Sequence, residues 1–457
     1  MEPVDNTDRF SGIISKVFDV SFLVKRFLML YLILLPFQMI PKFLDLEESI
    51  VTKIIFNIDE LTTLFMFFIL LTFIAIKPQV YRFRYDAMPT RLLLLFLFVA
   101  CLSILWNSML WNRLYILQGF FSTYNFLKNI IVVCFFATLK WDKNDLKFLI
   151  KGIAITVLIL AIAGIIGEIV ALMGKDPHNL VRTEEYKTRF GFYRVQSLTG
   201  EGSTNYLAMY GVLGFFLVDF AFRYSLTRKL GKFIVFLLIV LTFSKRGWLS
   251  LFLMVFLIRK KIKSIWLFSL LLIGVFGLYI IFLILETYDI VDPEHYMRAY
   301  GYLKSIELFI QHPILGVGPG MFGDLGSVIF GSPYYSGIPI YMYDKIAERG
   351  GIDSFWPVIL AQTGVVGFLL FGAIFTSFYL KIEKIANKFK ILDNELYKVG
   401  RVLGAYIIAL ILMGLGSNLN KPFVTYTFFG LYGIYVSLFF QFSKPETLGG
   451  KNEKQNN

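Results

Sequence analysis

The stretch GIAITVLILAIAGIIGEIVALM, residues 152–173, decides the class of fold. A hydrocarbon core of roughly 30 Å requires about 20 apolar residues in a helix, and Glu168 is the one charged residue in this run. Similar apolar runs recur at 27–43, 58–76, 92–110, 120–139, 204–222, 228–244, 247–258, 264–285, 355–380, 402–418 and 422–442. We therefore predict an all-α polytopic membrane protein with about twelve transmembrane helices.

The composition excludes a water-soluble domain. Hydrophobic residues make up 57% of the chain and charged residues 17%, whereas soluble domains carry about 25% charged residues. The 49 Phe and 25 Tyr suit lipid-facing helices with aromatic rings at the membrane interfaces. The net charge of +13 comes mostly from short loops between apolar runs, so it indicates membrane topology and no nucleic-acid partner.

Basic residues in short loops predict the orientation of the chain. With twelve spans counted, every strongly basic loop falls on one side, which should be the cytoplasm; these loops lie within 77–91, 140–151, 223–232, 259–263 and 381–401. Both termini share that side. We therefore predict a cytoplasmic N-terminus (1–26), transmembrane helices 1–9 (27–285), helices 10–12 (355–442) and a cytoplasmic tail (443–457).

Two long segments face outward in this topology, at about 174–203 and 286–354, and long loops in a compact protein are usually functional. The first breaks the charge rule, because it carries Lys175, Arg182, Lys187, Arg189 and Arg194. These cations either pair with acidic neighbours that include Glu201 or attract an anionic substrate. The sequence leaves both interpretations open.

Lys245 and Arg246 lie between two unusually short apolar arms, 233–243 and 248–258. Eleven helical residues reach only about 17 Å, so the pair should sit at the outer membrane surface or slightly below it. Charges at that depth are costly and indicate function. The alternative is a hairpin turn whose Lys and Arg snorkel to the interface.

The second outward loop holds the densest cluster of unusual residues. From Arg298 to Phe309 the pattern predicts an amphipathic helix, on which Arg298 is either a solvated charge or a ligand-binding group. HPILGVGPGMFG, residues 312–323, follows as a tight Pro- and Gly-rich loop. Its glycines match GxGxxG, but the strand and βαβ context of a dinucleotide site are missing, so we expect a backbone that approaches some other ligand closely.

The loop ends at Asp353, which either caps the next helix or serves as a general base at the membrane surface. No metal site is predicted, because the three histidines are scattered and Cys101 and Cys134 lie inside apolar runs. No cofactor is expected.

Four stretches resemble the O-antigen ligase and polymerase superfamily: 194–205, LTFSKRGW at 241–248, 298–322 with HPILGVGPGMF, and 353–371 with QTGVVGFLLF. The resemblance implies a membrane glycosyltransferase of the C type (GT-C) in the bacterial inner membrane. Such enzymes act at its outer face on glycans linked to undecaprenyl diphosphate. The resemblance also implies that Arg246 and Arg298 bind the diphosphate, and guanidinium groups suit phosphate oxygens. We place Lys245, Arg194, Gly316, Gly318 and Gly320 in the same substrate site.

One departure from the family bears on the reaction. Ligases carry a His where the large loop meets the next span, and here that position reads Asp353-Ser354. This favours a polymerase, with Asp353 as the candidate base and Glu201 and His312 as rivals. A ligase acting on lipid A core and a lipid-linked glycan transporter are the alternatives. Membrane lipids, a chain-length regulator and a flippase are the expected partners.

Overall fold

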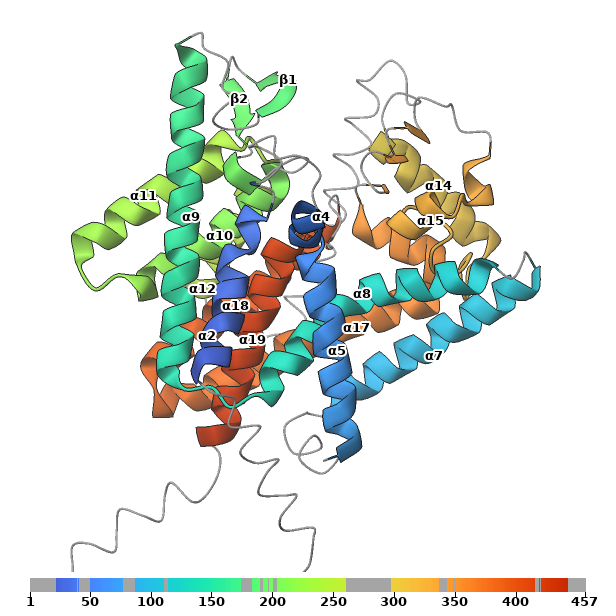
Figure 1. Cartoon of the computed structure of the whole chain (residues 1–457), viewed down its shortest axis with the longest axis horizontal. Coiled ribbons are helices and arrows are strands. Elements are labelled where there is room, and N and C mark those ends of the chain that lie inside the picture. The colour runs from blue at the N-terminus through green and yellow to red at the C-terminus, as the bar shows by residue number, and fades with distance from the viewer. Residues whose placement is uncertain are drawn as a thin grey trace, which may run out of the picture.

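A computed structural model describes residues 22–38, 40, 50–76, 87–110, 114–173, 183–189, 192–195, 197–199, 204–259, 297–336, 343–344, 346–347, 351–352, 354–415, 419 and 421–442. Long helices dominate this part of the chain (Figure 1). The α-helices of the described residues are α2 (Phe22–Leu34), α4 (Ile50–Phe56), α5 (Ile58–Ile76), α7 (Ala87–Leu110), α8 (Leu114–Thr138), α9 (Lys143–Leu172), α10 (Thr204–Ala221), α11 (Ser225–Leu241), α12 (Lys245–Arg259), α14 (Met297–Gln311), α15 (Leu325–Ile329), α17 (Phe355–Leu392), α18 (Asn394–Gly414) and α19 (Pro422–Phe442).

Seven helices among the described residues are long and apolar enough to cross a membrane: Arg91–Met109, Tyr115–Thr138, Lys143–Leu172, Thr204–Ala221, Phe355–Leu392, Asn394–Gly414 and Pro422–Phe442. Every predicted apolar run overlaps a helix except 264–285, which lies outside the described residues. The polytopic helical class is confirmed, and the number twelve stays a prediction. Helices α11 and α12 have 17 and 15 residues, so both are short, although each is longer than its eleven-residue apolar arm.

Helix α9 shows how a span divides its surface between lipid and protein. Five isoleucines at spacings of three and four residues are 41–47% exposed and form one stripe; they are Ile155, Ile159, Ile162, Ile166 and Ile169. Glu168 lies off this stripe and is buried. An exposed apolar stripe on a helix of 30 residues fits contact with lipid.

A small antiparallel hairpin, β1 (Thr183–Arg189) and β2 (Phe192–Val195), follows α9 and lies at the top of Figure 1. It falls in the first predicted outward loop, where no strand was expected. Val195 is buried, and Ser197 Oγ donates to the carbonyl of Leu160 on α9 at 2.6 Å. The hairpin is therefore anchored on α9.

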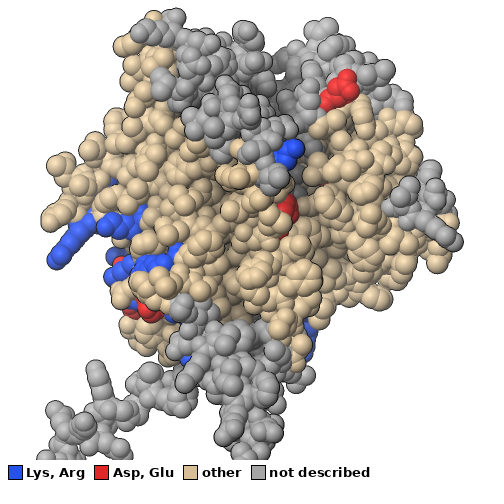
Figure 2. Space-filling view, viewed as in Figure 1, with Lys and Arg blue, Asp and Glu red and all other residues tan. Residues whose placement is uncertain are grey.

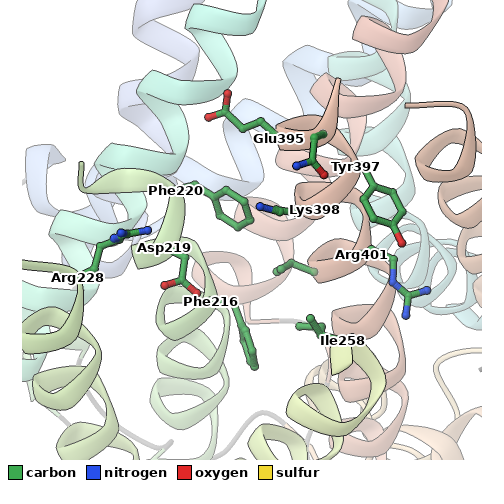
Figure 3. Close-up of a pocket in the computed structure, with 11 residues that line it drawn as sticks. Phe216, Asp219, Phe220, Arg228, Ile258, Glu395, Tyr397, Lys398 and Arg401 are labelled. Atoms are coloured by element: carbon green, nitrogen blue, oxygen red, sulfur yellow. The ribbon is translucent and has the colours of Figure 1, made fainter. Parts of the chain in front are cut away.

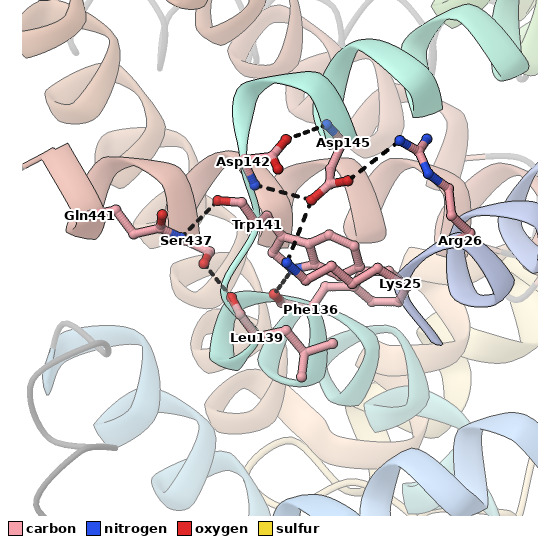
Figure 4. A network of polar contacts seen from close by, with 9 residues as sticks. All are labelled: Lys25, Arg26, Phe136, Leu139, Trp141, Asp142, Asp145, Ser437 and Gln441. Atoms are coloured by element: carbon pink, nitrogen blue, oxygen red, sulfur yellow. Dashed lines mark hydrogen bonds and ion pairs between the residues drawn. The ribbon is translucent and has the colours of Figure 1, made fainter. Parts of the chain in front are cut away.

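At the opposite end of the bundle, polar contacts join helix ends that are far apart in sequence (Figure 4). Asp145, in the first turn of α9, lies 3.7 Å from Lys25 Nζ and 3.9 Å from an Arg26 nitrogen, both on α2. Gln441 near the end of α19 donates to the carbonyl of Trp141 at 2.8 Å. Lys143 pairs with Asp393, the N-cap of α18, at 2.5 Å. Four helix ends therefore meet there.

Helix α17 is broken at Gly364, where φ is 61° and ψ is −167°. The predicted span at 355–380 is therefore two helical parts with a kink between them. The second part, 365–392, exceeds by itself the roughly 20 residues that a bilayer requires. The first part packs with α14 and carries Val358 and Ala361 into a separate apolar core.

Candidate functional site

Lys245 and Arg246 are the first two residues of α12, so the hairpin turn that the sequence offered as the alternative does not include them. The turn lies at 242–244, where Phe243 has a φ of 47°. Ser244 Oγ accepts a hydrogen bond from the backbone N–H of Gly247 at 3.1 Å, which is the geometry of an N-cap. Lys245 is exposed and Arg246 is half-buried.

This helix start is held against α10. Ser244 Oγ donates to Asn205 Oδ1 at 2.8 Å, and a Cβ added at Gly247 would lie only 2.5 Å from the Cβ of Ala208. A helix N-terminus carries a partial positive charge, so two cations there are unfavourable for the helix itself. The same N-terminus with two adjacent cations is well suited to bind an anion such as phosphate.

Neighbouring helix ends bring further groups to this region. Lys421, which directly precedes α19, lies with its Nζ 5.9 Å from the ring of Tyr206 in the first turn of α10. Tyr302 on α14 donates to the carbonyl of Leu415 at the end of α18. Position 298 lies one helical turn before Tyr302 on the same helix. The starts of α10, α12 and α19 are thus linked, and α14 is tied to the end of α18.

The loop at 312–324 fills the break in α17. The N–H groups of Val317 and Gly318 donate to the carbonyls of Ala361 and Gln362, both at 2.9 Å. In the other direction, the N–H of Val365 donates to the carbonyl of Pro313 at 2.9 Å. Backbone groups that the kink leaves unpaired in the helix are therefore satisfied by the loop, as an apolar environment requires.

Gly316, Gly318 and Gly320 have φ values of 67°, 101° and 84°, in the left-handed region that favours glycine. A Cβ at Gly316 would lie 2.4 Å from the backbone of Gln362, and one at Gly320 would lie 2.7 Å from the carbonyl oxygen of Gln118. The close approach that these glycines permit is thus to α17 and α8. Their contact with a substrate stays a prediction.

Polar side chains of α7 and α8 hold the loop from below. Ser103 Oγ donates to the carbonyl of Leu315 at 2.8 Å, and Tyr115 donates to that of Val317 at 3.1 Å. Gln118 donates to the carbonyl of Gly320. Our sequence analysis missed these residues. Their helical spacing was a usable signal, since Tyr115, Gln118 and Ser122 recur at intervals of three and four within an apolar run.

Asp324 is a buried carboxyl group in this loop. It caps the short helix α15 by accepting from Ser327 N at 2.8 Å, and Ser122 donates to its other oxygen. Burial raises the pKa of this carboxyl above its ordinary value, although the hydrogen bonds from Ser122 and Ser327 act in the opposite direction. The group is enclosed by protein and serves to hold the loop.

The remaining predicted site residues fall in different places. His312 is half-buried, and its ring lies 6.5 Å from that of Tyr334. Arg194 lies on β2 and Arg298 on α14, with backbone positions described. Glu201 and Asp353 lie outside the described residues. Ser354, which follows Asp353, occupies the N-cap position of α17. Within the described part of the chain, no three metal-binding side chains gather.

Residues 230–372 match the sequence model of a family described as O-antigen ligase. No protein with a curated description matches the chain. The matched segment covers about a third of the sequence and includes Lys245, Arg246, α14, the 312–324 loop and the break in α17. This match supports the predicted resemblance to the O-antigen ligase and polymerase superfamily over that segment.

Proposed function

We propose that this protein is a polysaccharide polymerase of the bacterial inner membrane. It transfers a growing glycan from undecaprenyl diphosphate to another lipid-linked repeat unit at the outer face. The observation that carries the proposal is the capped start of α12, where Lys245 and Arg246 stand together inside the O-antigen ligase segment. Cations at a helix N-terminus suit the diphosphate of such a donor.

In the proposed reaction, a hydroxyl oxygen of the acceptor sugar forms the new bond to the anomeric carbon of the donor glycan. The bond from that carbon to the diphosphate oxygen breaks, and undecaprenyl diphosphate leaves with the electron pair. Arg246 and Arg298, with Lys245 beside them, stabilise the charge that develops on the leaving group. Asp353 accepts the hydroxyl proton, with His312 and Glu201 as the rival bases.

The proposed topology follows from the charges. The end of the bundle that holds Lys25, Arg26, Lys143 and Lys147 faces the cytoplasm, and the α12 start faces outward. A C-type glycosyltransferase arrangement, cytoplasmic termini, and a chain-length regulator and a flippase as partners belong to the same proposal.

The test measures glycan chain length in a deletion strain that expresses wild type, Arg246→Ala or Arg246→Lys. We expect Arg246→Ala to leave single repeat units on the normal acceptor, and Arg246→Lys to restore only short chains because lysine lacks the bidentate fork. Arg259→Ala is the matched control, since Arg259 ends the same helix and should restore full length.

Asp353→Asn tests the base in the same strain, and normal polymerisation by that variant would exclude Asp353. A deletion strain that accumulates long lipid-linked chains while its lipid A core carries no glycan would identify a ligase. A ligase is the second candidate because the matching family is described as O-antigen ligase. Loss of all outward-facing lipid-linked glycan would instead indicate a transporter.

A further inference from the structure

A cavity of about 650 Å³ lies where α10 and α12 end and where α11 and α18 begin (Figure 3). Aromatic rings of Phe216, Phe220 and Tyr397 form part of its wall. Ile258, in the last turn of α12, also lines it. Since Arg246 lies in the first turn of that helix, about 18 Å of helix separates this cavity from the proposed diphosphate site.

The acidic side chains that line this cavity are already paired with lysines. Glu395 lies 3.1 Å from Lys143 and 3.0 Å from Lys147. Asp219 pairs with Lys232. None of these lysines is among the lining residues. The negative charge at the cavity is therefore compensated from outside it.

Two of the three basic side chains of the lining, Arg228 and Lys398, are not compensated in the same way. Arg228 Nε is buried and has no hydrogen-bond partner, and Lys398 forms no ion pair with any described residue. Figure 3 shows the Lys398 ammonium group pointing toward Phe220. Arg401 donates to the carbonyl of Leu257 at 2.8 Å and lies 3.9 Å from Glu383. A buried N–H without an acceptor is unfavourable, and a bound anion would satisfy it.

We propose that this cavity binds the phosphate group of an anionic membrane lipid. A guanidinium and an ammonium group suit phosphate oxygens, and basic pockets between transmembrane helices accept such headgroups. Beside Arg228 on α11, Leu226, Leu230 and Phe233 are 77%, 57% and 58% exposed and offer apolar surface for acyl chains. Lys and Arg gather on this flank, at the lower left of Figure 2. Soluble phosphate shares the headgroup chemistry, but the apolar surface favours the lipid.

The test uses the purified full chain in nanodiscs of phosphatidylcholine, with or without phosphatidylglycerol, at an ionic strength of about 0.15 M. The Tm is measured for wild type, Arg228→Gln/Lys398→Gln and the single variant Lys398→Gln. The matched control is Lys229→Gln/Lys390→Gln, which also removes two positive charges but at exposed positions outside the lining. Inorganic phosphate added to the phosphatidylcholine discs forms a further arm.

We expect phosphatidylglycerol to raise the Tm of wild type and of the control by roughly 2 °C or more. The rise should shrink by at least about half in Lys398→Gln, an exposed side chain whose loss spares the packing, and vanish in the double variant. An equal rise in all four proteins, or none in wild type, would overturn the proposal. A rise produced by inorganic phosphate alone, and lost in the double variant, would replace the lipid with a soluble anion.

Discussion

Gly316 and Gly364 face each other across the junction between the loop and the broken helix. Both have left-handed backbones, with φ values of 67° and 61°. A Cβ at Gly364 would lie 2.3 Å from the carbonyl oxygen of Ile314, and one at Gly316 would lie 2.4 Å from the backbone carbon of Gln362. The backbone opposite each glycine therefore excludes any side chain at that position, because backbone cannot move aside as a flexible side chain can.

Gly364→Ala and Gly316→Ala should each destabilise the protein by at least about 2 kcal/mol, because strain in the left-handed region adds to a backbone clash. Gly372→Ala is the control, since Gly372 lies later in α17 with nothing within 4 Å of an added Cβ. That change should be neutral or stabilise by up to about 1 kcal/mol. Thermal unfolding in detergent measures all three, and equal Tm values for Gly364→Ala and Gly372→Ala would contradict the expectation.

Asp324 should make stability depend on pH in a particular direction. Its pKa is raised by burial, so the folded state holds the proton more tightly, and the contribution of this group falls as pH rises through the folded pKa. Asp324→Asn keeps a capping oxygen without the charge and should remove this dependence. Asp324→Ala loses the cap of α15 and should cost about 1 kcal/mol or more at every pH. The Tm measured against pH for the three proteins separates these effects.

The break in α17 shows, at the scale of the element, what the sequence could not reveal. The segment QTGVVGFLLF contains Gly364 and Gly367, and only Gly364 interrupts the helix. The helix breaks at Gly364 because the loop at 312–318, about fifty residues earlier, supplies backbone partners for the N–H and carbonyl groups that the break leaves unpaired. The local sequence around Gly364 does not show that such a distant partner exists. Helix α14 was predictable, because its amphipathic spacing is a property of the local sequence.

The start of α12 gives a second example. The sequence placed Lys245 and Arg246 between short apolar arms, with a hairpin turn as the alternative to a functional pair. Ser244 instead caps the helix, so both charges fall in its first turn. A Ser before the apolar run was a visible N-cap signal, but its partner Asn205 comes from another helix and could not be identified from spacing. The sequence therefore predicted which cations are candidates, but it did not predict that both lie in the first turn of a capped helix.

Asp393 joins two helices and should respond to acid. It accepts from Glu395 N at 2.9 Å and Leu396 N at 3.2 Å as the cap of α18, and it pairs with Lys143 of α9. Burial alone would raise its pKa, but the hydrogen bonds from Lys143 and the Leu396 N–H outweigh this effect, so the pKa lies below its ordinary value.

The stabilisation from Asp393 is therefore present above the unfolded pKa of about 3.9 and is lost as pH falls through the lower folded value. Asp393→Asn should retain the cap but lose the ion pair and this acid dependence, while Asp393→Ala should cost about 1 kcal/mol or more at neutral pH. Unfolding curves recorded from neutral to acidic pH provide the measurement. If the stability of wild type and of Asp393→Asn fell in parallel below pH 4, that result would count against this role for Asp393.

At the scale of the whole molecule, charge divides the protein into two ends. Lysines and arginines of α2 and α9 meet the acids of α9 and α18 at one end, while the loop at 312–324 and α15 lie at the other (Figures 1 and 4). The basic short loops predicted that these cations share one end of the bundle, and the assignment of that end to the cytoplasm stays a prediction. The hairpin of β1 and β2 was not predictable, since its strands are short and charged.

This division predicts which residues a membrane-impermeant thiol reagent reaches in spheroplasts. In a background of Cys101→Ala and Cys134→Ala, Ser336→Cys should be labelled, because Ser336 is exposed in the loop that we predict to face outward. Ile391 is 90% exposed at the end of the bundle that we predict to be cytoplasmic. Ile391→Cys should therefore be labelled only after the membrane is permeabilised. Labelling of Ile391→Cys in intact spheroplasts would reverse the orientation.

The exchange of hydrogen bonds between the loop and α17 also constrains the order of biogenesis. The ribosome releases residues 312–324 before α17, so the partners of the break are synthesised before the helix that contains it. The carbonyls of Ala361 and Gln362 and the N–H of Val365 therefore have their partners available as soon as α17 is made. In a circular permutation that moved α17 ahead of the loop, α17 would be synthesised before the backbone partners of its break.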